Sequence, residues 1–178
     1  MSGRMVTLKD ILESRDRREQ QRRTLLQTSL LTLLQLSVNI PGSRKNNPMI
    51  KEIFREGLNS LSKVLKEEIR SSHINEELMT GPEGFLLLDL EPNRAKGICS
   101  ALENDHILGR LWDMDVYRST GELLSRRDLS LPSRMCYICE RPAHECSRSG
   151  KHDSRQLEEY ILNLYRVFQS IKSDTELK

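Results

Sequence analysis

Residues 109–117, GRLWDMDVY, predict a β-strand that carries two carboxylates, Asp113 and Asp115. Residues i and i+2 of a strand share one face, so both acids point the same way. Like charges repel each other, and burying them without partners is costly. Because the other residues of the strand are mostly apolar, we expect the strand to be partly buried. The sequence therefore predicts that a positively charged group, either a side chain or a bound cation, offsets the charge of the two acids.

The stretches on both sides of this strand predict further helices and strands. Residues 33–42 and 85–91 are apolar runs that end at turn residues, which is typical of strands. A Gly-bearing turn predicts that residues 117–125 continue the central strand as a hairpin. Helices are expected from Thr7 into the charged N-terminal stretch and at residues 49–70, 94–104 and 154–172. This order indicates an α+β fold, with helices on a small mixed or antiparallel sheet.

Composition limits the classes of protein to consider. The chain has 178 residues, 37% hydrophobic and 30% charged, which fits one domain over residues 1–178 with a Cys-rich basic loop at about 128–152. The formal net charge of +2 does not favour a nucleic-acid binder. The sequence predicts neither a membrane span nor a secretory signal. Four cysteines without an export signal are more typical of reduced thiols or metal ligands than of disulfides. We therefore expect a cytoplasmic protein that does not contact membranes.

The acid pair itself suggests a cation site. Two carboxylates on one strand face can hold a hard divalent cation such as Mg²⁺ or Mn²⁺, and substrate phosphates can complete its coordination. The alternative is an exposed edge strand, where aspartate costs little. Arg110 directly precedes the strand and is a candidate either to neutralise a phosphate or to pair with one of the acids.

Two other stretches offer cations for phosphate groups. The loop NIPGSRKNN, residues 39–47, combines a glycine that permits close backbone approach with two cations, although it lacks the spacing of a P-loop. Arginines of the N-terminal helix recur at helical spacing and share one face. The alternatives are an ordinary connection and a solvated helix surface. The candidate anion-binding residues are Asn39, Gly42, Arg44, Lys45, Arg15 and Arg18.

The segment CYICERPAHECSRSGKH holds a possible metal site. Its spacing, C-x2-C-x6-C-x5-H, involves Cys136, Cys139, Cys146 and His152. Thiolates two residues apart can bind one Zn²⁺, with a third cysteine and a histidine completing a tetrahedron. The alternative is a set of reduced structural thiols. Nearby cations, among them Arg148, form a local basic patch.

Six motifs in order give the sequence a resemblance to a known family. They are SRDRREQQ, SVNIPGSRK, TGPEG, GRLWDMDVY, SRRDLSL and SRMCYICERPAHECSRSGKH. Together they resemble the apo-citrate lyase phosphoribosyl-dephospho-CoA transferases, also called citrate lyase holo-acyl-carrier-protein synthases.

The resemblance implies a nucleotidyltransferase-like reaction. The family transfers 2′-(5″-triphosphoribosyl)-3′-dephospho-CoA onto a serine of the acyl-carrier (gamma) subunit of citrate lyase, and pyrophosphate leaves. On this interpretation Asp113, Asp115 and Arg110 are catalytic, with Asp89 and Glu103 as candidate general bases. The basic segments would contact the donor or the acidic carrier. The competing hypothesis is a zinc-containing module that binds nucleic acid or protein, although an aromatic content of 4% leaves few stacking platforms for bases.

Overall fold

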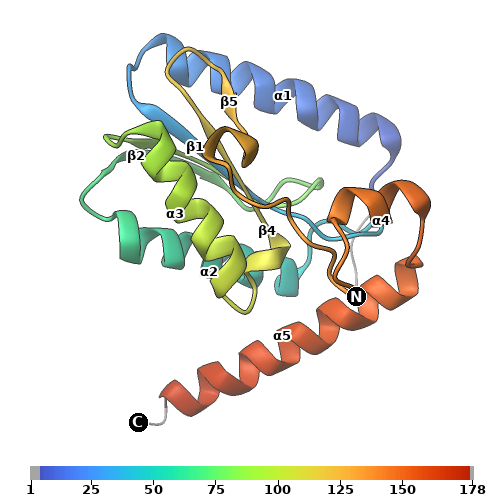
Figure 1. Ribbon diagram of the computed structural model, residues 1–178. Coiled ribbons are helices and arrows are strands. Elements are labelled where there is room, and N and C mark those ends of the chain that lie inside the picture. Colours follow the sequence, from blue (N-terminus) through green and yellow to red (C-terminus); the bar gives the residue numbers. More distant parts are fainter. Residues whose placement is uncertain (1–4, 177–178) are drawn as a thin grey trace.

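The computed structural model describes residues 5–176, in which helices cover both faces of a five-stranded antiparallel sheet (Figure 1). The strands lie in the order β2-β3-β1-β4-β5. They are β1 (Thr32–Val38), β2 (Ile69–Asn75), β3 (Glu83–Leu88), β4 (Trp112–Tyr117) and β5 (Leu123–Leu124). The helices are α1 (Leu8–Gln27), α2 (Pro48–Leu65), α3 (Pro92–Asp105), α4 (Ala143–Ser149) and α5 (Ser154–Glu176). The α+β class is confirmed, and of the two sheet types expected the antiparallel one is found.

The two faces of the sheet differ in how much apolar surface they bury. Helices α2 and α3 pack on one face over the larger core cluster, which includes Leu34, Leu36 and Trp112 (Figure 1). Helix α1 crosses the other face, where the buried apolar cluster among residues 5–176 is limited to Leu33, Phe85, Leu87 and Tyr117. Because this cluster fills only one end of the α1 face, the rest of that face is left to polar side chains.

Glycines let β4 approach the helices closely enough to define its orientation. The Trp112 indole is fully buried and donates from Nε1 to the Ile53 carbonyl of α2 at 2.9 Å. A Cβ at Gly57 would lie 3.0 Å from that indole nitrogen, and one at Gly109 would lie 2.3 Å from the Leu102 carbonyl oxygen. Side chains at these positions would push the strand away, so the glycines help to direct Trp112 into the core and the acids to the opposite face.

Side chains from α3 complete the outer edge of β4. Strand β5 pairs only with Val116 and Tyr117, which leaves the backbone of Met114 without a strand partner on that side. The Met114 N–H donates to Glu103 Oε1 at 2.9 Å, and its carbonyl accepts from Lys96 Nζ at 3.0 Å. Two buried charged side chains thus satisfy backbone groups that a neighbouring strand would otherwise bond.

Some element boundaries differ from the sequence expectation. The helix expected at 49–70 ends at Leu65, so its last part is wrong: Ile69 packs against the core from β2 rather than from α2. The helices expected at 94–104 and 154–172 are confirmed as α3 and α5, which begin or end a few residues further out. The Cys-rich stretch contains the short helix α4. Within residues 5–176, no helix is both long and apolar enough to cross a membrane. The one-domain organisation stays a prediction.

Candidate functional site

Asp113 and Asp115 lie on the face of β4 that α1 covers. Asp113 is opposite Ser37 of β1 and Asp115 is opposite Gln35, while Trp112, Met114 and Val116 point into the core on the other side. Burial, followed by the charge of Asp113, raises the pKa of Asp115 to about 6. Lys96 and Arg134 offset only part of this effect. The pair is therefore short of positive charge.

A polar cavity of about 350 Å³ opens over this end of the sheet. It lies between α1, the end of β1 and the TGPEG turn at residues 80–84. The cavity brings together five residues that the sequence proposed separately, namely Arg15, Arg18, Asn39, Lys45 and Asp113. Its cations and its acid have the chemistry expected of a site for a phosphate-rich ligand with a divalent cation.

Helix α1 is held over the cavity by a buried carboxylate at the start of β3. Glu83, with 6% of its side chain exposed, accepts from Arg17 Nη2 at 3.0 and 3.1 Å. The Ser14 hydroxyl accepts from Arg17 at 3.1 Å and from the Thr80 hydroxyl at 3.0 Å. Arg17 therefore has a structural role, because its hydrogen bonds fix α1 to β3. Arg18 lies 3.9 Å from Glu83 and lines the cavity.

These supporting residues were missed by sequence reasoning about single sites. Ser14 and Arg17 lie in the motif SRDRREQQ, and Thr80 and Glu83 in the motif TGPEG. Both motifs contribute to the family resemblance, and of their residues only Arg15 and Arg18 are predicted from the sequence to bind an anion. The signal that could have identified these residues is the occurrence of both motifs in one chain. The motifs contact each other in the fold, through hydrogen bonds between residues that are 66 positions apart.

The loop that follows β1 packs directly on the TGPEG turn. Gly81 has a φ of +110°, and a Cβ there would lie 3.0 Å from the Lys45 carbonyl oxygen, so this position requires glycine. Lys45 Nζ donates to the Ile40 carbonyl, and burial lowers the pKa of the lysine. Gly42 and Arg44 of the same loop do not line the Asp113 cavity. They line a separate cavity of about 260 Å³ against α5.

The arginine that contacts the acid pair is Arg134 rather than Arg110. Arg134 Nη1 donates to Asp113 Oδ1 at 3.4 Å, and its Nη2 donates to Glu103 at 2.5 Å. The Arg110 guanidinium lies 5.9 Å from the Tyr137 ring centroid. Its Nε and Nη2 are buried and have no hydrogen-bond partner among residues 5–176. The alternative in which Arg110 pairs with an acid of the strand is therefore wrong for this structure.

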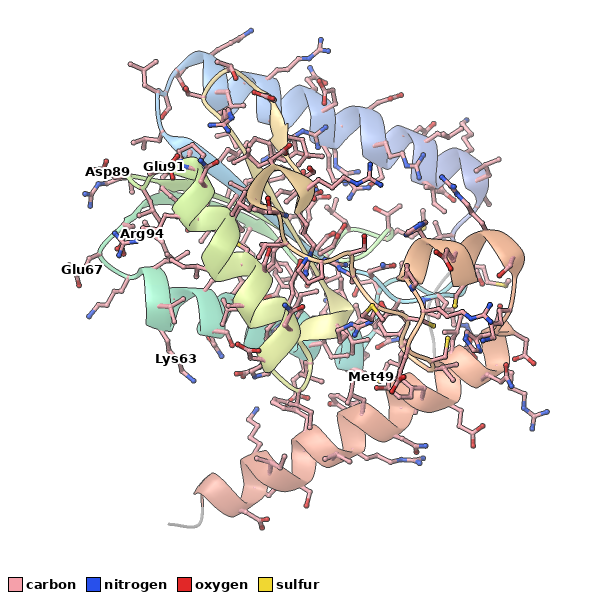
Figure 2. The ribbon with its side chains drawn as sticks, in the orientation of Figure 1. Met49, Lys63, Glu67, Asp89, Glu91 and Arg94 are labelled. Carbon is pink, nitrogen blue, oxygen red and sulfur yellow. The ribbon has the colours of Figure 1, made fainter. Side chains whose placement is uncertain are left out.

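The two candidate general bases are not placed to act at the pair. Asp89, labelled in Figure 2, follows β3 at the opposite end of the sheet. It pairs there with Arg70 at 2.8 Å. Glu103 is 1% exposed and accepts from Arg126, Arg134 and the Met114 N–H. The first is remote from the pair, and the second is fully engaged in hydrogen bonds.

Three cysteines and one histidine form a second cluster, outside the cavity. The ligand atoms of Cys136, Cys139, Cys146 and His152 all lie within 4.8 Å of one another, so the cluster could hold a metal ion. Hydrogen bonding with the His152 ring, whose Nε2 lies 3.3 Å from Cys139 Sγ, lowers the pKa of Cys139 to about 6, whereas burial raises the pKa of Cys146 to about 11. Arg148 lies exposed on α4 beside this cluster and does not line the Asp113 cavity.

Fold and site together define an α+β protein with a cation-lined cavity that reaches Asp113 of the acid pair, and a separate Cys/His cluster. Residues 6–168 match the family model of the apo-citrate lyase phosphoribosyl-dephospho-CoA transferases, and the chain belongs to this family. A relative of that name from Citrobacter koseri is 38% identical over 149 residues, 83% of this chain and 81% of the relative. Another, from Escherichia coli O139:H28, is 34% identical over 158 residues, 88% of this chain and 86% of the relative.

The raised pKa of Asp115 predicts a gain in stability when its charge is removed. The folded pKa of about 6 exceeds the ordinary value of 3.8, so the free energy of unfolding falls as the pH rises through this window. In a buffer without divalent cations, Asp115→Asn should raise the free energy of unfolding at pH 7 by up to about 3 kcal/mol. The gain should vanish near pH 4. Urea titrations at both pH values measure it, with the exposed Asp89→Asn as control, and a variant less stable than wild type at pH 7 would contradict the burial argument.

Proposed function

We propose that this chain attaches the phosphoribosyl-dephospho-CoA group to the apo-acyl-carrier (gamma) subunit of citrate lyase. The donor is 2′-(5″-triphosphoribosyl)-3′-dephospho-CoA, the acceptor is a serine of the carrier, and pyrophosphate is released. Besides the family, the supporting observation is the cavity in which Arg15, Arg18 and Lys45 face the strand that carries Asp113. A triphosphate needs that density of positive charge, and its transfer needs a divalent cation beside it.

The acid pair fits Mg²⁺ or Mn²⁺. Asp113 lines the cavity with 41% of its side chain exposed, and Asp115 is two residues away on the same strand face. The raised pKa of Asp115 indicates a carboxylate whose ionised form lacks a counter-charge, which a cation would supply. When bound, such an ion neutralises charge on the phosphates and on the departing pyrophosphate.

The other candidate residues divide by location. Arg15, Arg18, Asn39 and Lys45 would bind the triphosphate, because they line the Asp113 cavity. Gly42 and Arg44 line the neighbouring cavity, where they would contact a different part of the long donor. Arg110 remains a catalytic candidate. Two of its buried guanidinium nitrogens donate no hydrogen bond within residues 5–176, so they would be satisfied by an anion. Exposed Arg148 would contact the carrier, since acyl carriers are typically acidic.

We expect direct transfer, with no covalent enzyme intermediate. The serine oxygen forms the new bond to phosphorus while the bond to the pyrophosphate oxygen breaks. The cavity hydroxyls Ser14 and Thr80 are hydrogen-bonded to each other rather than to a base that could activate them. The expected cytoplasmic location stays a prediction.

The activity assay mixes purified protein, the donor, Mg²⁺ and apo-carrier, and reads the mass of the carrier. Wild-type protein should add one phosphoribosyl-dephospho-CoA group, and Asp113→Asn should lower the rate by about 10²–10³ because it removes charge that holds the cation. Asp89→Asn, an acid at the far end of the sheet, should keep normal activity. An unmodified carrier with the wild type would refute the proposed function, and labelled enzyme in the absence of carrier would refute direct transfer.

We further propose that the Cys/His cluster binds Zn²⁺. Three thiolates and one imidazole are a common ligand set of structural zinc. Such a site would brace the segment from which Tyr137 reaches the Asn39 carbonyl at 2.9 Å. The alternative function, a zinc module that binds nucleic acid or protein, is not better supported by the relatives.

Zinc content tests this site directly. Protein purified without added metal should contain about one zinc per chain, and chelation should lower its melting temperature. Cys139→Ser should lose the zinc, whereas Cys99→Ala, at a buried cysteine in α3, should retain it. Substoichiometric zinc together with a melting curve that chelation leaves unchanged would favour reduced structural thiols.

A further inference from the structure

We propose that Arg134 is a catalytic residue that contacts the reacting phosphate, and that Glu103 is the positioning residue that holds it there. The inference rests on the proposed function and adds two residues to its machinery. Its basis is that the Arg134 guanidinium contacts two different carboxylates. Nη2 donates to buried Glu103 at 2.5 Å, and Nη1 donates to Asp113 at 3.4 Å.

Glu103 is placed relative to the acid pair through the backbone of β4. Its Oε1 accepts from the N–H of Met114, the residue between Asp113 and Asp115, at 2.9 Å. The carboxylate comes from α3 and is 1% exposed. A buried, fully bonded acceptor of this kind has little freedom to move. Arg134, which belongs to an irregular segment, therefore takes its position from β4 through Glu103.

The two contacts of Arg134 are unequal in strength. A separation of 2.5 Å between charged partners is a short hydrogen bond, whereas 3.4 Å lies beyond the usual range. Asp113 is also the more exposed acid partner, with 41% of its side chain accessible against 1% for Glu103. If Asp113 turns to a divalent cation, only the weak contact is lost. Arg134 then stays anchored by Glu103, with Nη1 available to a phosphate oxygen beside the cation.

A guanidinium in that position would act on the charge that develops during transfer. The serine oxygen of the carrier bonds to phosphorus and its hydroxyl proton passes to solvent water. The bond from phosphorus to the pyrophosphate oxygen breaks, and the bonding electrons leave with pyrophosphate. Arg134 gives up no proton in this step. Its fixed donors stabilise the negative phosphate oxygens without having to reorganise. Preorganised stabilisation of this kind is usually the largest single contribution to an enzyme's rate enhancement.

Arg126 provides a matched control, because it shares Glu103 without reaching the acid pair. Its Nη2 donates to Glu103 Oε2 at 2.7 Å, and it also bonds Asn104 at 3.3 Å. Both arginines are thus partners of the same buried carboxylate. Removing either leaves Glu103 short of one partner and should cost similar stability. Only Arg134 also contacts Asp113.

The test compares Arg134→Ala with Arg126→Ala in the carrier assay, with urea titrations alongside. Arg134→Ala should lower kcat by about 10²–10³, with a smaller change in KM for the donor. Arg126→Ala should lower kcat by no more than about fivefold at comparable loss of stability. Millimolar guanidinium should restore part of the activity of Arg134→Ala and none of that of Arg126→Ala. Glu103→Gln, which keeps one acceptor oxygen, should lower kcat more than Arg126→Ala does.

Equal losses in the two alanine variants, or no response to guanidinium, would overturn the proposal and leave Arg134 as a structural ion pair. If Arg134→Ala does not fold, Arg134→Lys gives the same comparison, because lysine keeps the charge but loses the planar fork. A folded lysine variant with wild-type kcat would also overturn it. Failure of the proposed function is distinguishable, since it would appear as a wild-type protein that leaves the carrier unmodified.

Discussion

The buried carboxylate of Glu103 links helix α3, strand β4 and the segment after β5 through hydrogen bonds. It accepts from Arg126, from Arg134 and from the backbone of β4 between the two acids. Removing a charge from water costs several kcal/mol, and this cost is offset only when the partners are well placed. The edge of the sheet and the irregular segment after β5 are therefore coupled. Neither can shift without leaving a buried charge unpaired.

The α1 face of the sheet is divided between stability and chemistry. At one end α1 buries Leu33, Phe85 and Tyr117, which anchors the helix. At the other end the same helix meets the sheet through Glu83 and Arg17, and a cavity remains. The acid pair lies at this polar end, with a raised pKa at Asp115 that weakens the fold at neutral pH. Functional sites commonly retain destabilising features of this kind.

The sequence predicted the parts of the site that depend on local periodicity. Alternation along β4 predicted that Asp113 and Asp115 share a face, and helical spacing placed Arg15 and Arg18 together. Contacts between distant residues could not be predicted in this way. Arg110 precedes the acid-bearing strand in sequence, yet Arg134, twenty-one residues beyond Asp113, pairs with the acid.

The misplaced end of α2 and the unpredicted β2 have a similar explanation. Ile69 continues the apolar spacing of the helix, but its burial is provided by the sheet. Strand β2 itself is a largely exposed edge strand with several polar residues, so it lacks the apolar alternation that marks a strand. In both places tertiary pairing decides the structure where local pattern is weak or ambiguous.

The central claim is that the two acids of β4 hold the divalent cation that accompanies the donor's phosphates. Crystals grown with donor and Mn²⁺ test it most directly, because Mn²⁺ can be located by its anomalous scattering. The account predicts one peak within coordination distance of both carboxylates, about 2.0–2.3 Å from an oxygen of Asp113 and of Asp115. Donor bound in the cavity with no manganese between these acids, or with the ion held elsewhere, would contradict it.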